Sequence, residues 1–437
     1  MKRDIDSEIF FPNDITPISY GGFLLLVSPS NANWIVLKNQ IQVDIIKKLI
    51  LHHSKKKLIE EFHQHIADVE YIINEIEKRH FCEKMIHTEE GFTLRIYLTN
   101  SCNLRCKHCF MYAGAPLENE LKYEEIIEIL NQSKQHGCIK VIFTGGEVVL
   151  KEGFIDILQH AKKLGLYTQV LTNGVLWNSD LVEEAEKYID EIQVSIDGFD
   201  DVTNSAIRGS GTYYKAMETI DRFVKHKNVF VSVITTPLYE MLEIYKDKYI
   251  EFGKKMVQKY GSDNFLVIFA NELIDGRNLK AEKNKNRNMS KTISDIYEEI
   301  YPNSQLTTFV MNHKFNRSYR SCGYGSLTIN SNGDFYFCGR IHDVRCYGNI
   351  RKMDFCKVLE LRKKARELSY VDNITPCKNC AVRNICGGGC RVANVPEMIS
   401  ADLNKNTKDE IFERECSNEY KENIYKLMIE SSEFLYW

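Results

Sequence analysis

Ten of the fourteen cysteines in this 437-residue chain fall into two sets whose spacing suits metal ligation. The first set comprises Cys102, Cys106 and Cys109. Three thiolates on one short loop can hold three irons of a cubane [4Fe-4S] cluster and leave the fourth iron open to a non-protein ligand. A zinc knuckle would need a fourth protein ligand, and His108 lies between two thiolates, where chelation is geometrically poor. We therefore expect an iron-sulfur cluster with an open coordination site.

The second set of cysteines occupies the C-terminal part of the chain. Its members are Cys322, Cys338, Cys377, Cys380, Cys386, Cys390 and Cys416, and Gly333 lies between the first two. Paired zinc ribbons would explain a Cys-x2-Cys pair, but neither the pair that flanks Gly333 nor the distant Cys416. The spacing of this set suits metal ligation but is not explained by zinc ribbons alone.

The composition is that of an ordinary folded protein, with 43% hydrophobic and 27% charged residues. The formal net charge of −3 creates no overall field that would attract nucleic acid or an anionic membrane. No stretch approaches the roughly 18 apolar residues of a membrane span, and the start of the chain is polar. We expect a cytoplasmic protein with neither a nucleic-acid nor a membrane partner. A reducing cytoplasm also disfavours a disulfide framework.

The elements that must position the first set alternate between strand and helix patterns from about residue 92 to 275. Six strands joined by amphipathic helices predict parallel βαβ units, in an open sheet or a partial barrel. Function then belongs beyond the carboxyl ends of the strands, where the Cys102 loop begins. The predicted strands are Thr93–Leu98, Lys140–Phe143, Tyr167–Leu171, Glu191–Ser195, Val229–Ile234 and Phe265–Phe269. The predicted helices include Tyr123–Gln135, Phe154–Leu164 and Asp180–Tyr188, the last capped by Ser179.

Residues 1–88 predict a small α+β unit. Gly22–Val27 and Trp34–Leu37 read as a β-hairpin, and helical patterns follow over Gln40–His52, Lys56–His65 and Asp68–Arg79. A hairpin with three helices is typical of a winged-helix-like module. A nucleic-acid-binding winged helix would carry a basic recognition helix, whereas the third helical pattern is acidic. Lys280–Arg287 is charged and apolar-poor, which predicts a surface linker.

On these motifs the chain resembles the radical S-adenosylmethionine (SAM) superfamily, whose CxxxCxxC loop is matched by Cys102, Cys106 and Cys109. Further positions match the family in order along the chain: Gly145, Gly146 and Glu147 after the second strand, Asn173 after the third, Ser195 and Asp197 at the fourth, and then Arg208. The resemblance implies that the Gly-Gly-Glu motif holds the SAM amino group and that Arg208 pairs with the SAM carboxylate. Asn173, Ser195 and Asp197 would lie near the SAM ribose. Val148 replaces a proline common in the family, which alters loop stiffness more than chemistry.

The seven later cysteines resemble the SPASM extension of radical SAM enzymes that modify peptides and proteins. The resemblance implies two auxiliary [4Fe-4S] clusters, and hence three clusters in all. Cys377, Cys380, Cys386 and Cys416 would close one cluster, and Cys322, Cys338 and Cys390 would hold the other with one protein ligand missing. Either the substrate or solvent fills that position, or Cys346 or Cys356 does. Both of these are more often plain buried thiols.

With this core, the N-terminal module resembles a RiPP recognition element, which binds the leader of a precursor peptide by strand addition beside its third helix. The implied α/β architecture is a winged-helix-like domain (1–88), a partial (β/α)6 TIM barrel that forms the radical SAM core (89–290) and a SPASM domain (291–437). The implied activity generates a 5′-deoxyadenosyl radical, abstracts hydrogen from a ribosomal precursor peptide and forms a cysteine thioether crosslink. Carbon-carbon crosslinking, a sulfatase-type formylglycine maturase and a non-catalytic zinc scaffold remain alternatives. A flavodoxin or ferredoxin would supply electrons.

Overall fold

The computed structural model describes residues 9–435 except 52–53, 87–90, 262 and 404–411. These residues form two compact units. One comprises residues 90–302 and 325–364, and the other comprises 1–89, 303–324 and 365–437. The second unit therefore joins the N-terminal segment to most of the cysteine-rich segment, which the order along the chain does not suggest. The domain bounds expected from the sequence stay a prediction.

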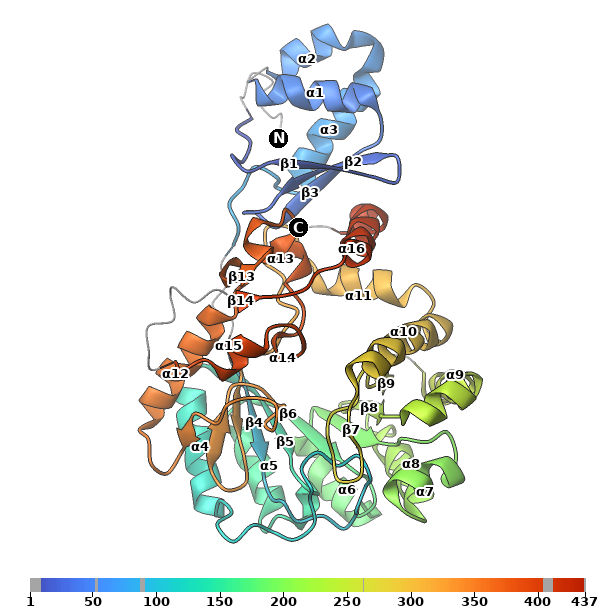
Figure 1. The fold of residues 1–437 in the computed structure, drawn as a ribbon, viewed down its shortest axis with the longest axis vertical. Coiled ribbons are helices and arrows are strands. Elements are labelled where there is room, and N and C mark those ends of the chain that lie inside the picture. The colour runs from blue at the N-terminus through green and yellow to red at the C-terminus, as the bar shows by residue number, and fades with distance from the viewer. Residues whose placement is uncertain (1–8, 52–53, 87–90, 262, 404–411, 436–437) are drawn as a thin grey trace. The chain divides into compact units, whose positions relative to one another are not determined.

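Six parallel strands form the centre of the first unit (Figure 1). They follow one another in chain order across the sheet, and each pairs in parallel with the next. The predicted α/β fold with six parallel strands is confirmed. The strands are β4 (Phe92–Tyr97), β5 (Cys138–Thr144), β6 (Tyr167–Thr172), β7 (Glu191–Ser195), β8 (Phe230–Thr235) and β9 (Phe265–Phe269). The helices between them are α4 (Tyr123–Gln135), α5 (Phe154–Lys163), α6 (Ser179–Ala185), α7 (Asp201–Arg208), α8 (Thr212–Phe223) and α9 (Tyr239–Tyr260).

Two expectations about helix ends were wrong. The residue that caps α6 is Asn178 rather than Ser179, because the Asn178 backbone is extended and its Oδ1 accepts the Leu181 N–H at 2.8 Å. The expected linker at 280–287 is instead largely the start of α10 (Lys283–Ile300). Its first turns are polar because they are solvent-exposed, and the buried face of the helix begins only at Met289.

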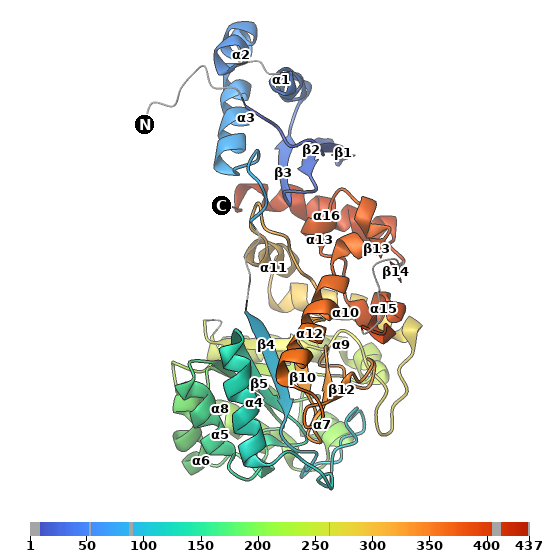
Figure 2. The same ribbon diagram turned by 90° about the vertical axis from the view of Figure 1, so that its left-hand side faces the viewer.

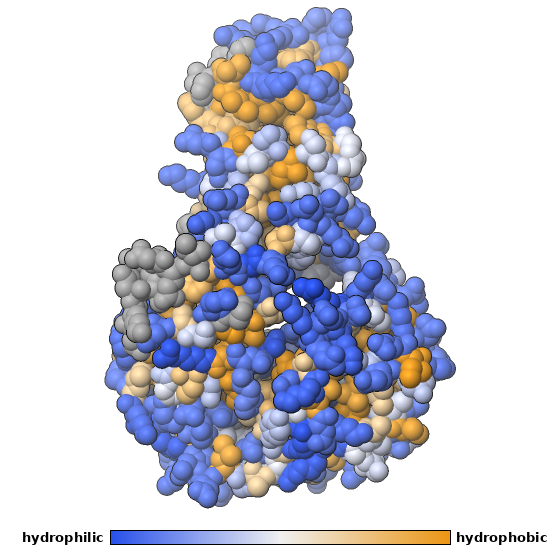
Figure 3. Space-filling view, in the orientation of Figure 1, coloured by the Kyte–Doolittle hydropathy of each residue, from blue (hydrophilic) through white to orange (hydrophobic). Residues whose placement is uncertain are grey.

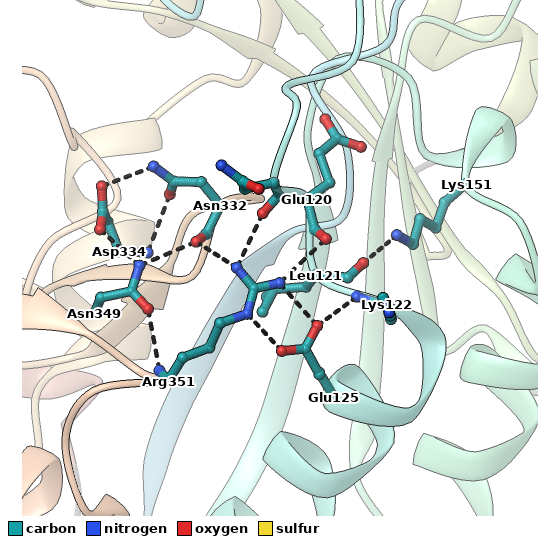
Figure 4. Close-up of polar contacts among 10 residues, drawn as sticks. Glu120, Leu121, Lys122, Glu125, Lys151, Asn332, Asp334, Asn349 and Arg351 are labelled. Carbon is teal, nitrogen blue, oxygen red and sulfur yellow. Dashed lines mark hydrogen bonds and ion pairs between the residues drawn. The ribbon is translucent and has the colours of Figure 1, made fainter.

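Three short strands extend the same sheet beyond β4. They are β10 (Leu327–Ile329), which runs parallel to β4, and the antiparallel β11 (Asp334–Tyr336) and β12 (Gly348–Asn349). Arg351 follows β12 and attaches these strands to the start of α4. It pairs with Glu125 in α4 and donates to the carbonyl of Asn119, just before α4, at 3.0 Å (Figure 4). The first part of the cysteine-rich segment is thus built onto the core sheet.

The outer surface of this unit carries exposed apolar side chains over α7 to α9 (Figure 3). Val202 is 77% exposed, Tyr214 is 63% exposed and Ile244 is 70% exposed. Single exposed apolar side chains are ordinary on protein surfaces. Among the described residues, no helix is long and apolar enough to cross a membrane.

The second unit begins with an antiparallel sheet of β1 (Thr16–Tyr20), β2 (Phe23–Ser28) and β3 (Asn33–Leu37). The predicted hairpin is confirmed as β2 and β3, whereas β1 was missed, because it is short and contains Pro17. The expected helices appear as α1 (Gln40–Ile50), α2 (Lys55–Glu61) and α3 (Ile66–Lys78), with a 3-10 turn at His63–His65.

Strands β2 and β3 are buried on both faces of the sheet, which explains their nearly continuous apolar sequences (Figures 1 and 2). Leu26, Ile35 and Leu37 pack against α1 and α3. Val27 and Trp34 face the opposite way and pack against α11 (Ser304–Asn312), α13 (Arg383–Cys386) and α16 (Asn418–Glu430). The N-terminal module is thus part of one hydrophobic core with C-terminal segments, not a separately folded attachment.

Polar contacts reinforce this core. The Trp34 indole N–H donates to the Met428 carbonyl at 2.9 Å. Arg79, 1% exposed, donates to the carbonyls of Trp34 and Ser432 at 3.1 and 2.7 Å. It also pairs with Glu75. One buried guanidinium therefore joins α3, β3 and the C-terminal end of the chain.

Candidate active site

The three thiols of the first cysteine set lie on the loop that follows β4. The Cys109 N–H donates to the Cys106 carbonyl at 3.3 Å, which closes a tight turn within the loop. Burial raises the pKa of Cys102 to about 11, and the neighbouring Cys106 and Cys109 add to the rise. Thiols bind metal as thiolates, and these three oppose one another's ionisation. The positive charge of bound metal would offset that cost.

A single metal ion and a cubane cluster place their sulfur ligands at different spacings. Four sulfurs around one zinc lie about 3.8 Å apart, since each Zn–S bond is about 2.3 Å. Among the described residues, no three His, Cys, Asp or Glu side chains converge closely enough to hold one metal ion. In a cubane, by contrast, each thiolate binds a different iron, so the sulfurs stand farther apart.

The loop after β9 holds the cysteine loop from the other side. Arg277 donates to the carbonyls of Cys106, at 3.1 Å, and Ala113. Gly276 is required there, because a Cβ would lie 2.5 Å from the His108 carbonyl oxygen. Sequence reasoning missed Arg277, whose only signal was its position just after the sixth predicted strand.

The Gly-Gly-Glu motif lies against the residues that precede Cys102. The N–H groups of Gly146 and Glu147 donate to the carbonyls of Thr99 and Ser101 at 2.7 and 2.8 Å. A Cβ on Gly146 would lie 2.2 Å from the Ser101 oxygen. Gly145 has φ +149°, a conformation suited to glycine. Both glycines are therefore needed for this close approach.

Glu147 is fully buried at the end of β5. Its carboxylate accepts the Thr172 hydroxyl and, at 2.8 Å, the Asn173 N–H. Burial raises the pKa of Glu147 to about 7 despite these hydrogen bonds. The Asn173 amide in turn donates to the Asn103 side chain at 2.9 Å and approaches the Cys102 sulfur at 3.9 Å. The tips of β5 and β6 and the cysteine loop thus form one connected site.

Asp197 lies on the other side of the loop and is fully buried. Its Oδ2 is 2.6 Å from both His108 Nε2 and Arg208 Nε. Burial disfavours the charged carboxylate, yet Arg208 and His108 hold the pKa of Asp197 below its usual value. Arg208 also reaches the Cys106 sulfur at 3.9 Å. Ser195 ends β7 and is half-buried.

The loop that contains Cys338 reaches the same end of the sheet. The Tyr97 hydroxyl donates to the Gly339 carbonyl at 2.8 Å, and Arg340 forms an ion pair with Glu272 beyond β9. The rings of Phe110 and His342 meet edge to face, with centroids 6.0 Å apart. These contacts tie the Cys338 loop to both β4 and the cysteine loop.

Four of the later cysteines surround one pocket in the second unit. They are Cys377, Cys380, Cys386 and Cys416, which the SPASM resemblance groups together, and Arg414 and Tyr420 also line the pocket. The Cys380 N–H donates to the Cys377 carbonyl at 2.8 Å. Burial raises the pKa of Cys377 and of Cys380, and the other thiols of the pocket raise both further. Four sulfurs that line a common pocket fit the complete ligand set of a cubane.

Two members of the incomplete set also meet in the second unit. The thiol of Cys390 lies beside that of Cys322 and lowers the pKa of Cys322. The N–H groups of Arg391 and Tyr324 also donate to the Cys322 sulfur, at 3.3 and 3.5 Å. Cys338 belongs to the first unit.

The expectation that Cys346 and Cys356 are buried was wrong, because both are exposed. Cys346 lies in the loop before β12, where its thiol contacts the Gly348 carbonyl at 3.5 Å. Cys356 lies in the first turn of α12 (Phe355–Leu368), with its sulfur 4.0 Å from His136 Nε2. Both thiols are exposed because side chains in a surface loop and in the first turn of a helix can remain in contact with solvent.

Six parallel strands with a three-cysteine loop after the first strand, together with a cysteine-rich extension, are the arrangement expected from the resemblance to radical SAM proteins with a SPASM segment. Comparison with known families agrees. Residues 96–246 match the radical SAM superfamily, and residues 321–381 match SPASM, an iron-sulfur cluster-binding domain. Domains of these two kinds bind iron-sulfur clusters and SAM.

Among individual proteins, the sporulation killing factor maturation protein SkfB of Bacillus subtilis (strain 168) is 34% identical over 32% of this chain. That match spans 34% of SkfB, about a third of its length. The AdoMet-dependent heme synthase of Oleidesulfovibrio alaskensis is 26% identical over 67% of this chain and 81% of that protein. The solved structure of anSMEcpe with bound AdoMet and the Cp18Cys peptide is 18% identical, with a TM-score of 0.56 over 79% of this chain and 98% of that one. This likeness shows a shared fold.

Proposed function

We propose that this chain is a radical SAM enzyme that modifies a ribosomally made precursor peptide and closes a cysteine thioether crosslink in it. The observation that carries the proposal is the three-thiol loop after β4, with Glu147 on one side and Arg208 on the other. Peptide modification is also supported by the similarity to SkfB, whose name describes maturation of a killing factor.

The proposed cofactors are SAM and three [4Fe-4S] clusters. When bound, they supply a 5′-deoxyadenosyl radical that can take a hydrogen atom from an unactivated carbon. The Glu147 carboxylate and the backbone of Gly145 and Gly146 would hold the SAM ammonium group. Asn173 and Ser195 would lie by the ribose, and Arg208 would face the SAM carboxylate. The cluster ligands would be Cys102, Cys106 and Cys109; Cys377, Cys380, Cys386 and Cys416; and Cys322, Cys338 and Cys390.

A thioether is preferred over a carbon-carbon bond because the third ligand set is one thiolate short. A substrate cysteine is a chemically suitable fourth ligand, since iron-sulfur clusters favour thiolates. Forming the C–S bond removes one hydrogen atom from carbon, which the 5′-deoxyadenosyl radical would take, one proton from the thiol, and one electron, which a proposed auxiliary cluster would accept. The exposed Cys346 and Cys356 are the competing candidates for the same position.

The N-terminal module is the proposed site for the leader of the precursor peptide. A strand added beside α3 would pair with the outward-facing groups of β3. Two of these groups already have partners, because Val36 O accepts the Tyr71 hydroxyl at 2.9 Å and Trp34 O accepts Arg79. Strand addition at this edge therefore requires the Tyr71 hydroxyl to release the Val36 carbonyl.

The first experiment measures 5′-deoxyadenosine made by anaerobically reduced protein with SAM. We expect production by the wild type, loss in Cys102→Ala, and wild-type behaviour in Cys82→Ala, a thiol outside the three ligand sets and not a candidate for the missing ligand. Undiminished production in Cys102→Ala would refute the assignment. Co-expression with a short peptide encoded beside the gene should yield a product lighter by two hydrogens for each crosslink, with no such loss in the Cys102→Ala variant.

A second candidate is a maturase that acts on a cysteine or serine of a larger protein, which the fold likeness to anSMEcpe with its bound Cys peptide favours. Deleting residues 1–88 would not distinguish the two, because it would expose the face of the C-terminal core that packs against Val27 and Trp34. A single substitution at Tyr71 leaves that core intact. It should change binding of a leader peptide but not turnover of a leaderless substrate.

A further inference from the structure

Asp197 has more partners than a residue that contacts only SAM would need. Both carboxylate oxygens are engaged, Oδ2 by His108 and Arg208 at 2.6 Å and Oδ1 by the Thr236 N–H at 2.9 Å. The side chain has no exposed surface. The carboxylate thus lies within a closed set of protein donors.

The backbone around Asp197 is held as firmly as its side chain. Asn204 Oδ1 accepts the N–H groups of Asp197 and Gly198 at 2.9 and 3.3 Å. The Tyr249 hydroxyl donates to the Asp197 carbonyl at 3.0 Å. Position 198 must be glycine, because a Cβ would lie 2.1 Å from the Asn204 nitrogen. Contacts from α7 and α9 therefore fix where the carboxylate points.

Arg208 is the group that this carboxylate holds in place. It is the last residue of α7, and its guanidinium approaches the Cys106 sulfur at 3.9 Å. The adjacent Ile207 carbonyl accepts the Lys107 N–H at 3.0 Å, so the end of α7 lies directly against the cysteine loop. The charge beside Cys106 is therefore an arginine that Asp197 largely neutralises.

We propose that Asp197 is a positioning residue, which holds Arg208 against Cys106 and balances its charge, and which acts on the cysteine loop through Arg208 and His108 rather than by touching SAM. The inference rests on the proposed function, because it assumes an iron-sulfur cluster on this loop. Nearby charge and hydrogen bonds to the sulfurs tune the potential of such a cluster. A guanidinium favours the reduced, more negative state, whereas a carboxylate disfavours it.

The test measures the midpoint potential of the cluster on the Cys102 loop. Electron paramagnetic resonance monitors its reduction in protein without SAM. The test uses a background of Cys386→Ser and Cys390→Ser, which weakens the other two ligand sets. Asp197→Asn should raise the potential, because Arg208 is left unbalanced, and Arg208→Gln should lower it. The midpoint potential of the double variant should lie near that of the starting protein. The double variant should also recover any stability that either single variant loses, since it leaves no unpaired buried charge.

Asp200→Ala is the matched control, because Asp200 caps α7 without facing Cys106. It should weaken the helix and leave the potential unchanged. Unchanged potentials in both single variants at full iron content would overturn the inference, as would equal shifts in Asp200→Ala. Should Asp197→Asn fail to fold, the lower potential expected of Arg208→Gln still decides. Wild-type protein that binds no iron would instead refute the proposed function, so the two failures are distinguishable.

Discussion

Arg351 binds Glu125 through both carboxylate oxygens, with Nε 2.5 Å from Oε1 and a terminal nitrogen 2.8 Å from Oε2 (Figure 4). This two-point contact joins the turn after β12 to the first turn of α4. The hydrogen bond from Arg351 lowers the pKa of Glu125 to about 2. The pair is partly exposed, with 32% of each side chain accessible, so its contribution is modest.

Arg351→Ala should destabilise the protein by about 1 kcal/mol, a fall of roughly 2 °C in Tm. Because the folded pKa of Glu125 lies below its ordinary value of 4.5, the stabilisation is complete above pH 4.5 and is lost as the pH falls through 2. Thermal unfolding of wild type and variant should therefore differ more at pH 6 than at pH 3. An equal difference at both pH values would contradict this account.

Arg79→Met should destabilise the unit that contains the N-terminal module by about 3 kcal/mol or more. The substitution removes a buried cation and leaves the Glu75 carboxylate and the carbonyls of Trp34 and Ser432 without it. Denaturant unfolding monitored by tryptophan fluorescence measures the effect. Lys47→Met, which removes an exposed partner of Asp44, is the control and should change stability by less than about 0.5 kcal/mol. Similar losses in both variants would argue against the buried junction.

Glu147→Gln should flatten the pH dependence of stability in protein without SAM. The folded pKa of about 7 lies above the ordinary 4.5, because burial disfavours the carboxylate. The folded state thus holds this proton more tightly, so its stabilisation is complete below pH 4.5 and lost as the pH rises through 7. Between pH 5.5 and 8.5 the wild type should lose more Tm than Glu147→Gln, while the exposed Glu124→Gln should follow the wild type. A variant with the wild-type slope would exclude Glu147 as the titrating group.

Cys386→Ser should remove about four irons per chain, because it breaks a complete ligand set of one cubane. Cys356→Ser should leave the iron content unchanged, since that thiol is exposed and outside the three proposed sets. Iron and zinc analysis of anaerobically purified protein measures both, and zinc in place of iron would favour the scaffold alternative. Iron loss in Cys356→Ser would identify the missing ligand of the Cys322 set.

Tyr71→Phe should bind the leader of the precursor peptide about 2- to 10-fold more tightly, because the peptide no longer has to displace the phenol from the Val36 carbonyl. Tyr20→Phe, in β1 at the opposite edge of the sheet, should bind as the wild type does. Fluorescence anisotropy with a labelled synthetic leader measures the affinity. Weaker binding by Tyr71→Phe would mean that the hydroxyl contacts the peptide itself.

Much of the fold was predictable because its signals are local. The bounds of β7, β9 and α4 were predicted to the residue, since each is a regular apolar pattern between clear breaks. The elements that were missed or misplaced lack clear local signals. The first turns of α10 carry no apolar face, β1 is short and contains a proline, and Asn178 and Ser179 are both good caps, so composition could not choose between them.

By itself the sequence determined which thiols are spaced so that they could act together, and that a parallel sheet would carry the first three at the carboxyl ends of its strands. Ligand spacing and strand periodicity are patterns along the chain, so they can be recognised without any knowledge of packing. Only the tertiary structure decided that Asp197 faces Arg208 and His108, that Tyr71 closes the edge of β3, and that Trp34 reaches Met428. These contacts join residues far apart in the chain, and burial selects their partners, so no local pattern encodes them.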